Sequence, residues 1–216
     1  TPAGPSPVRV ATGLEISPRA AWAGSDRPPL GPFAVEDVRL LLVHHTATHS
    51  RPYTAASVPE IIRSSYDYHT SAVKGWKDVC YNFMVDRFGG VWEARGGSLA
   101  GPVVADATGG SQGFAQLVCM IGDFTSVMPS DAALTSLRRV LAWLGHRDGV
   151  NTVPGARVQF VSRGSNRWRA GTTVDAATIS GHRDMTWTGC PGDRFYPYVR
   201  DQLAADVTAV RQQMFP

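Results

Sequence analysis

The stretch ISGHRDMTWTGCPGD, residues 179–193, decides how the rest of the chain is interpreted. It places His182 and Cys190 eight residues apart, across a segment rich in turn-forming residues. Far upstream, LLLVHHTAT (residues 40–48) carries His44 and His45 at the end of an apolar run. Zinc is held by histidine nitrogen and cysteine thiolate, and a catalytic zinc site keeps three protein ligands and one position for water. His44, His182 and Cys190 supply that number, but a histidine beside an apolar strand is more often structural, so the spacing alone only suggests a metal site.

Length and composition describe one ordinary domain, and the charge by itself is compatible with both cell wall and nucleic acid. The chain has 216 residues, 43% of them hydrophobic, which is enough for a substantial core but cramped for two domains. A net charge of +3 suits an anionic polymer, yet 18% charged residues without a dense Lys/Arg cluster give no nucleic-acid footprint. No apolar run approaches the roughly 18 residues of a membrane span. We therefore expect neither a nucleic-acid partner nor a membrane span.

The N-terminal residues differ in composition from the rest. Residues 1–36 are rich in Pro, Gly and Ala and are expected to form an extended arm, of which SPRAAW (residues 17–22) docks on the domain. Residues 37–216 are expected to form a single domain. The beginning lacks a signal-peptide pattern, so the protein is either cytosolic or processed after export. The opening TPAGPSPV resembles a processed exported protein, and we expect a secreted, extracellular or cell-wall location.

Apolar patterning predicts an α/β fold. Strands are expected at residues 38–43 and 114–121, and residues 79–85 are expected to form a hairpin with residues 91–94 through Phe88-Gly89-Gly90. The glycine-rich residues 96–113 indicate a long surface loop. Residues 151–178 predict either a second hairpin or an irregular excursion.

Three helices are expected around these strands. Ser57 and Glu60 form a capping-box pattern for a helix that reaches about His69. Ser130 is expected to cap a helix with an apolar stripe. A terminal helix is expected over residues 198–214.

The odd number of cysteines leaves two alternatives open. If Cys190 binds a metal, Cys80 and Cys119 remain. They form a disulfide in an oxidising compartment, or they are two buried, unpaired thiols in apolar runs.

Four motifs together resemble one known family. VHHTAT, GWKDVCYNFMVD, CMIGDF and GHRDMTWTGCPGD occur in the order and spacing of the zinc-dependent type 2 N-acetylmuramoyl-L-alanine amidases, which include the peptidoglycan recognition proteins and T7 lysozyme. The resemblance covers about residues 17–210, and the excursion before GHRD resembles the version of actinobacteria. It implies a central mixed β-sheet flanked by helices. It also implies that Zn2+ is bound by His44, His182 and Cys190.

The resemblance also assigns catalytic roles. Tyr81 occupies the place of the family's catalytic tyrosine, although its other interpretation is a packed strand aromatic. Thr188 is similar to the threonine of active recognition proteins, which implies a hydrogen bond to the oxyanion; its other interpretation is a simple turn residue. The implied reaction is hydrolysis of the amide between N-acetylmuramic acid and L-alanine in peptidoglycan. The alternatives are a non-catalytic peptidoglycan-binding module, against which the presence of Cys190 argues, and an amidase acting on soluble muropeptides.

Substrate-binding residues are less specific. His45 follows His44 and in a strand faces the opposite way, so it is structural or adjacent to the substrate. Trp76 and Trp187 are candidates for stacking on sugar rings or lining a groove, the alternative being buried tryptophans beside turns. Leu99 stands near a place where many family members have histidine, which implies a different contact between residues 96–113 and the substrate.

Overall fold

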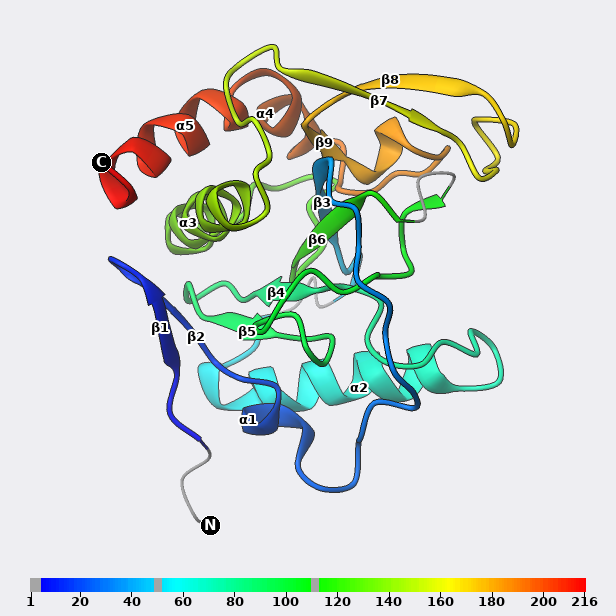
Figure 1. Ribbon diagram of the computed structural model, residues 1–216. Helices are drawn as coiled ribbons and strands as arrows, with labels where there is room; N and C mark the ends of the chain where they lie inside the picture. Colours follow the sequence, from blue (N-terminus) through cyan, green and yellow to red (C-terminus); the bar gives the residue numbers. More distant parts are fainter. Residues whose placement is uncertain (1–4, 49–51, 110–112) are drawn as a thin grey trace.

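A five-stranded mixed sheet forms the centre of the computed structural model, which describes residues 5–48, 52–109 and 113–216 (Figure 1). The strand order is β5-β4-β6-β3-β9. The central strands β3 (Leu40–His45) and β6 (Ala115–Met120) are parallel to each other, β9 (Ile179–Gly181) is parallel to β3, and β4 (Phe83–Val85) is parallel to β6. β5 (Val91–Glu93) is antiparallel to β4, which makes the sheet mixed. The expected α/β fold with a central mixed sheet is confirmed.

The register of the central strands places the histidine pair at one edge of the sheet. His44 is the partner of Cys119, and His45 is the partner of Met120, the last residue of β6. All six residues of β3 are buried, as expected for a parallel strand covered on both faces. Because the carboxyl ends of parallel strands meet at one edge, this edge is where a binding site is expected.

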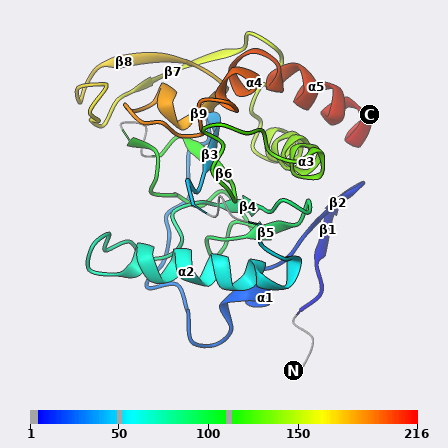
Figure 2. The ribbon, with the colours of Figure 1, turned by 180° about the vertical axis from the view of Figure 1, so that it is seen from behind.

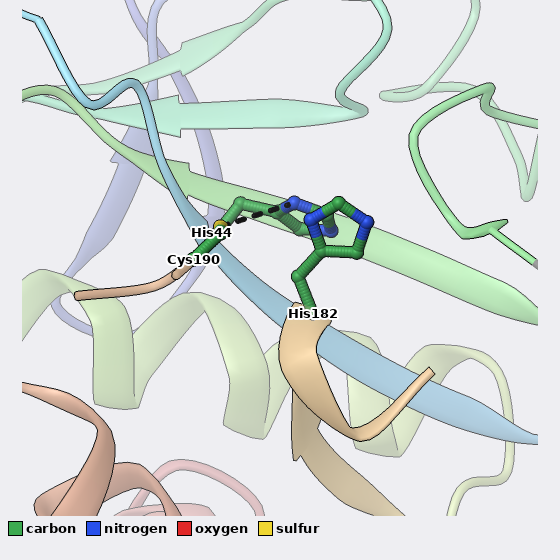
Figure 3. Close-up of side chains that lie close together, drawn as sticks. All are labelled: His44, His182 and Cys190. Carbon is green, nitrogen blue, oxygen red and sulfur yellow. Dashed lines mark hydrogen bonds between the residues drawn. The ribbon is translucent and has the colours of Figure 1, made fainter. Parts of the chain in front are cut away.

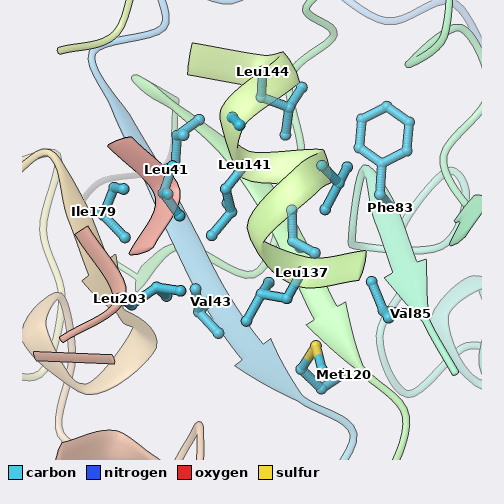
Figure 4. Packing of buried hydrophobic residues seen from close by; sticks show 14 of the residues in the cluster. Leu41, Val43, Phe83, Val85, Met120, Leu137, Leu141, Leu144, Ile179 and Leu203 are labelled. Carbon is cyan, nitrogen blue, oxygen red and sulfur yellow. The ribbon is translucent and has the colours of Figure 1, made fainter. Parts of the chain in front are cut away.

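Helices cover both faces of the sheet (Figures 1 and 2). One face packs against α3 (Asp131–Arg147) and α5 (Leu203–Met214), through a cluster that includes Leu41, Val43 and Leu137 (Figure 4). On the other face, Met84 and Cys119 pack against Ile62 of α2 (Val58–Thr70). Alternation along β3 places Leu41 and Val43 toward α3 and α5, whereas Leu40 and Leu42 pack in a separate cluster with Phe160.

The helix starts show one expected cap and one different cap. Ser130 accepts a hydrogen bond from the Ala133 backbone nitrogen and caps α3, as expected. Ser57 precedes α2, but its side chain does not cap that helix. Its hydroxyl instead closes a capping box with Thr54 in the preceding short helix η1 (Ala55–Ser57). The terminal helix is divided at Gln202 into α4 (Tyr196–Asp201) and α5.

The described part of the expected N-terminal arm, residues 5–36, is more structured than its composition indicates. β1 (Val8–Ala11) and β2 (Leu14–Ile16) form an antiparallel hairpin, and α1 (Ala20–Ala23) follows. Gly13, with φ of +72°, adopts the left-handed conformation that the turn requires. Leu14 and Ile16 are buried in the core, and Trp22 donates from Nε1 to the Glu93 carbonyl at 2.7 Å. SPRAAW docks as expected, but the arm is not simply extended, because its hairpin adds apolar residues to the core.

Two further expectations need correction or completion. The expected strand over residues 79–85 is shorter, because β4 begins only at Phe83. The Cys80 backbone nitrogen donates to the His69 ring, and the Val79 carbonyl accepts from Arg95. Residues 151–178 contain a hairpin of β7 (Arg157–Val161) and β8 (Thr173–Ala177). Residues 1–4 of the arm and 110–112 of the glycine-rich loop lie outside the described residues.

All three cysteines are free and buried, so Cys80 and Cys119 are two unpaired thiols and the disulfide alternative is not realised. None of the helices in the described ranges is long and apolar enough to cross a membrane.

Candidate metal centre

Three side chains from three segments converge at the carboxyl edge of the sheet (Figure 3). His44 stands near the end of β3, His182 begins the short helix η3 (His182–Asp184) directly after β9, and Cys190 follows a loop. One ligand atom from each lies within 4.8 Å of the others. Cys190 Sγ is 3.7 Å from His44 Nδ1, and the two imidazole centroids are 4.4 Å apart. The structure thus brings together the three residues expected to bind a metal.

Cys190 is held in place through its backbone and its sulfur. Its backbone nitrogen donates to the Thr188 hydroxyl at 3.2 Å, and its carbonyl accepts from Arg183 Nε at 3.2 Å. Its sulfur accepts from the His45 backbone nitrogen at 3.3 Å. A hydrogen bond to sulfur stabilises a thiolate, so these contacts suit a metal ligand.

The loop that begins with His182 is fixed by Asp184. Its carboxylate accepts from the Gly181 backbone nitrogen at 2.8 Å and closes the start of η3. The same carboxylate accepts a short hydrogen bond from the Tyr196 hydroxyl. Asp184 therefore sets the direction in which the chain leaves β9, and with it the position of the His182 ring.

The donor set fits zinc. Within the described residues, His44 Nε2 is buried without a hydrogen-bond partner, as expected of an imidazole arranged for another ligand. Burial lowers the pKa of His182 to about 4 and that of His44 well below its usual value, so both rings are neutral and able to coordinate. Burial raises the pKa of Cys190 to about 12; a bound cation reverses this by favouring the thiolate. Two nitrogens and one sulfur leave one of four tetrahedral positions open.

A cavity of about 380 Å3 lies beside this cluster, and His182 forms part of its wall. Tyr81 lines the same cavity, with its ring centroid 5.2 Å from that of His44. Burial and the neighbouring cysteines raise the pKa of Tyr81 well above its usual value, so its hydroxyl stays protonated. Tyr81 is therefore a hydrogen-bond donor next to the three candidate ligands.

The other expected site residues are distributed differently. Trp76 lines the cavity, and Lys74 Nζ lies 5.1 Å from the centroid of its ring. His45 does not line it, because alternation in β3 turns its ring to the α3 side, where Nδ1 accepts from the Phe124 backbone nitrogen at 3.3 Å. Trp187 is 67% exposed and also lies outside the cavity wall. The alternative of a buried tryptophan is therefore wrong for Trp187, and its stacking on a sugar ring stays a prediction.

Thr188 is exposed, and its hydroxyl oxygen accepts from the backbone nitrogen of Cys190. This contact positions Cys190, and the hydrogen bond from Thr188 to an oxyanion stays a prediction.

The structure places in the cavity wall one residue that was expected only as the end of a helix. His69, near the end of α2, lines the cavity, and its Nδ1 accepts from the Cys80 backbone nitrogen at 3.3 Å. Its ring centroid lies 5.3 Å from that of Trp76. The signal in the sequence was the KGWKD turn, which brings Trp76 back toward the helix end.

The chain is similar to known proteins over most of its length. A family model described as N-acetylmuramoyl-L-alanine amidase matches residues 34–193. The N-acetylmuramoyl-L-alanine amidase of Sus scrofa is 31% identical over 194 residues, which are 86% of this chain and 27% of that protein. The chain thus spans about a quarter of the length of this relative.

Solved structures with the same fold include two peptidoglycan recognition proteins. Drosophila peptidoglycan recognition protein SD has a TM-score of 0.65 at 19% identity, covering 86% of this chain and 92% of that one. Peptidoglycan recognition protein LE, solved with tracheal cytotoxin, has a TM-score of 0.63 at 25% identity, with the same coverage of 86% and 92%. With the family model matching well over half of its residues, the chain belongs to the N-acetylmuramoyl-L-alanine amidase family.

Proposed function

We propose that this protein uses zinc to hydrolyse the amide bond between N-acetylmuramic acid and L-alanine in peptidoglycan. The observation that carries the proposal is the convergence of His44, His182 and Cys190 within 4.8 Å beside a cavity of about 380 Å3. A binding module without turnover has no need for a buried cysteine among these ligands. The family membership and the pig relative named as this amidase support the same reaction.

The residues of the site suit amide hydrolysis. Zinc held by His44, His182 and Cys190 supplies Lewis-acid polarisation of a carbonyl and activates water at neutral pH. Tyr81, protonated and beside His44, donates a hydrogen bond to the oxygen of the scissile carbonyl as negative charge develops there. Burial of His44 and Cys190 excludes bulk water, which strengthens that hydrogen bond.

The cavity wall suits a ligand that is part sugar and part peptide. The Trp76 ring offers a face on which a sugar or an alkyl side chain packs, and Lys74 adds positive charge beside it. Peptidoglycan stem peptides carry carboxylates that complement this charge. Recognition protein LE was solved in complex with a monomeric diaminopimelic acid-type peptidoglycan, which supports a ligand of this class. Because peptidoglycan lies outside the cell membrane, we propose that the protein acts there.

Release of stem peptides from purified sacculi tests the proposal. We expect the zinc-loaded wild-type protein to release peptides with a free L-alanine amino terminus, and we expect a chelator or Cys190→Ala to abolish the release. Leu30→Ala, at a residue 55% exposed and outside the cavity wall, is the matched control and should retain full activity. Sacculi that bind the zinc-loaded protein without release would refute the enzyme and leave a binding module. Release from soluble muropeptides but not from sacculi would narrow the substrate to fragments.

A further inference from the structure

The tip of the β7–β8 hairpin lies against the segment that connects two of the candidate metal ligands. The hairpin tip comprises residues 165–168, and the ligand loop comprises residues 183–189, between His182 and Cys190. In the ribbon, the hairpin reaches across the outside of the molecule to this loop (Figure 1). Each of the residues 183–187 forms a hydrogen bond with a residue of the tip.

Asn166 makes the most complete of these contacts. Its side-chain amide donates from Nδ2 to the Trp187 carbonyl at 3.2 Å, and its Oδ1 accepts from the Trp187 backbone nitrogen at 2.7 Å. The same oxygen accepts a short hydrogen bond from the Thr186 hydroxyl. One side chain therefore satisfies both backbone groups of Trp187, as a neighbouring strand would do in a sheet.

The other three residues of the tip donate hydrogen bonds to the backbone carbonyls of residues 183–185. Arg167 donates to the Arg183 carbonyl, Trp168 Nε1 to the Asp184 carbonyl at 3.4 Å, and the Ser165 hydroxyl to the Met185 carbonyl at 3.1 Å. In a longer helix, the three carbonyls would accept hydrogen bonds from backbone nitrogens of the helix itself. Because η3 ends at Asp184 and the loop that follows is irregular, the hairpin tip supplies the donors instead.

The tip and the strands behind it are hydrogen-bonded among themselves. Ser165 Oγ accepts from the backbone nitrogens of Arg167 and Trp168, at 3.1 and 3.0 Å, which closes a tight turn. The two strands behind it are paired over five residues each, from the Arg157–Ala177 pair to the Val161–Thr173 pair. The hairpin therefore has regular hydrogen bonding of its own, independent of its contacts with the ligand loop.

We infer that the β7–β8 hairpin is a brace that fixes the ligand loop, and so the spacing of His182 and Cys190, before zinc binds, with Asn166 as the main positioning residue. The inference rests on the proposed zinc site but not on turnover. A flexible loop between two ligands has to be ordered when the metal binds, and that ordering weakens binding. Hydrogen bonds that orient ligands from outside the coordination sphere are typically worth about 10–100-fold in metal affinity.

Zinc affinity and amide exchange of the whole chain test the brace. Asn166→Ala removes all three Asn166 contacts, and we expect it to weaken zinc binding about tenfold, measured by competition with a chelating indicator. In the metal-free protein, we expect the amides of residues 183–190 to exchange faster than in the wild type. Arg169→Ala is the matched control, because none of the described residues forms a hydrogen bond or ion pair with that exposed side chain. It should leave both measurements unchanged.

Asn166→Asp serves as the second variant. It keeps the acceptor for the Trp187 nitrogen and the Thr186 hydroxyl but sets a carboxylate oxygen against the Trp187 carbonyl, so its affinity should lie between those of the wild type and Asn166→Ala. If Asn166→Ala does not fold, the zinc affinity of Asn166→Asp tests the brace in its place. A zinc affinity of Asn166→Ala within twofold of the wild type would overturn the brace, even where thermal stability falls; if only Asn166→Asp folds, a zinc affinity equal to that of the wild type would overturn it. If the wild type itself binds no zinc, the proposed function and the brace both fail.

Discussion

The histidine at the end of α2 makes the stability of the fold sensitive to acid. His69 is buried in the cavity wall, and its Nδ1 accepts from the Cys80 backbone nitrogen. Burial first, and then the charges of Lys74 and Arg95, lower its pKa to about 4 from the ordinary 6.5. Above pH 6.5 the ring is neutral in the folded and the unfolded chain, so it does not change the free energy of unfolding. As the pH falls from 6.5 to 4, the unfolded chain takes up a proton that the folded chain resists, so the free energy of unfolding decreases.

The size of this decrease follows from the pKa difference. Each pH unit between the two pKa values removes about 1.4 kcal/mol, so full titration removes about 3 kcal/mol. We expect wild-type protein to lose about 2 to 3 kcal/mol more between pH 7.5 and pH 4.5 than His69→Asn, in which the amide oxygen takes the place of Nδ1 as acceptor but does not titrate. Urea unfolding of both proteins in the presence of a chelator measures the difference.

The comparison cancels the other titrating groups. His44, His182 and the carboxylates are the same in both proteins, so only the difference between the two pH profiles reports on His69. Two parallel profiles, whatever their separation at pH 7.5, would refute the reasoning, because they would show that His69 takes up a proton as readily in the folded protein as in the unfolded chain.

Three further predictions concern the site and the core. Tyr81→Phe should reduce peptide release about 100- to 1000-fold, the usual effect of losing an oxyanion donor, while zinc still stabilises the variant; unchanged release would remove Tyr81 from the reaction. Free zinc at 100 times its dissociation constant should raise the free energy of unfolding by about 2.7 kcal/mol in wild type, and thermal unfolding of Cys190→Ala should show no such increase. Leu137→Ala, at a fully buried position of α3, should lower the free energy of unfolding in urea by about 2 to 5 kcal/mol. A decrease under about 1 kcal/mol would mean that neighbouring core side chains fill the space left by the leucine.

Local pattern was sufficient for the elements that are regular and buried. The apolar run before His44 became β3, the stripe after Ser130 became α3, and alternation correctly separated His44 from His45. These predictions succeed because the period of an apolar pattern is set by backbone geometry alone, whatever the element later packs against.

Composition misled where long-range pairing decides the structure. The first 36 residues read as an extended arm, yet Leu14 and Ile16 enter the core. Residues 79–81 have the composition of a strand, but the Cys80 nitrogen bonds to a histidine on α2. Neither contact has a signature in the neighbouring residues, because each partner lies elsewhere along the chain.

The sequence by itself supplied the candidate ligands, because the residue types of His44, His182 and Cys190 suit zinc and their motifs resemble those of a known family. Only the tertiary structure decided what surrounds them. It shows that Tyr81 and His69 line the cavity, that Trp187 does not line it, and that the hairpin tip forms hydrogen bonds with the ligand loop. The physical reason is that a ligand needs a particular atom type, which the sequence states, whereas its position depends on hydrogen bonds and packing between segments far apart in the chain, which exist only after folding.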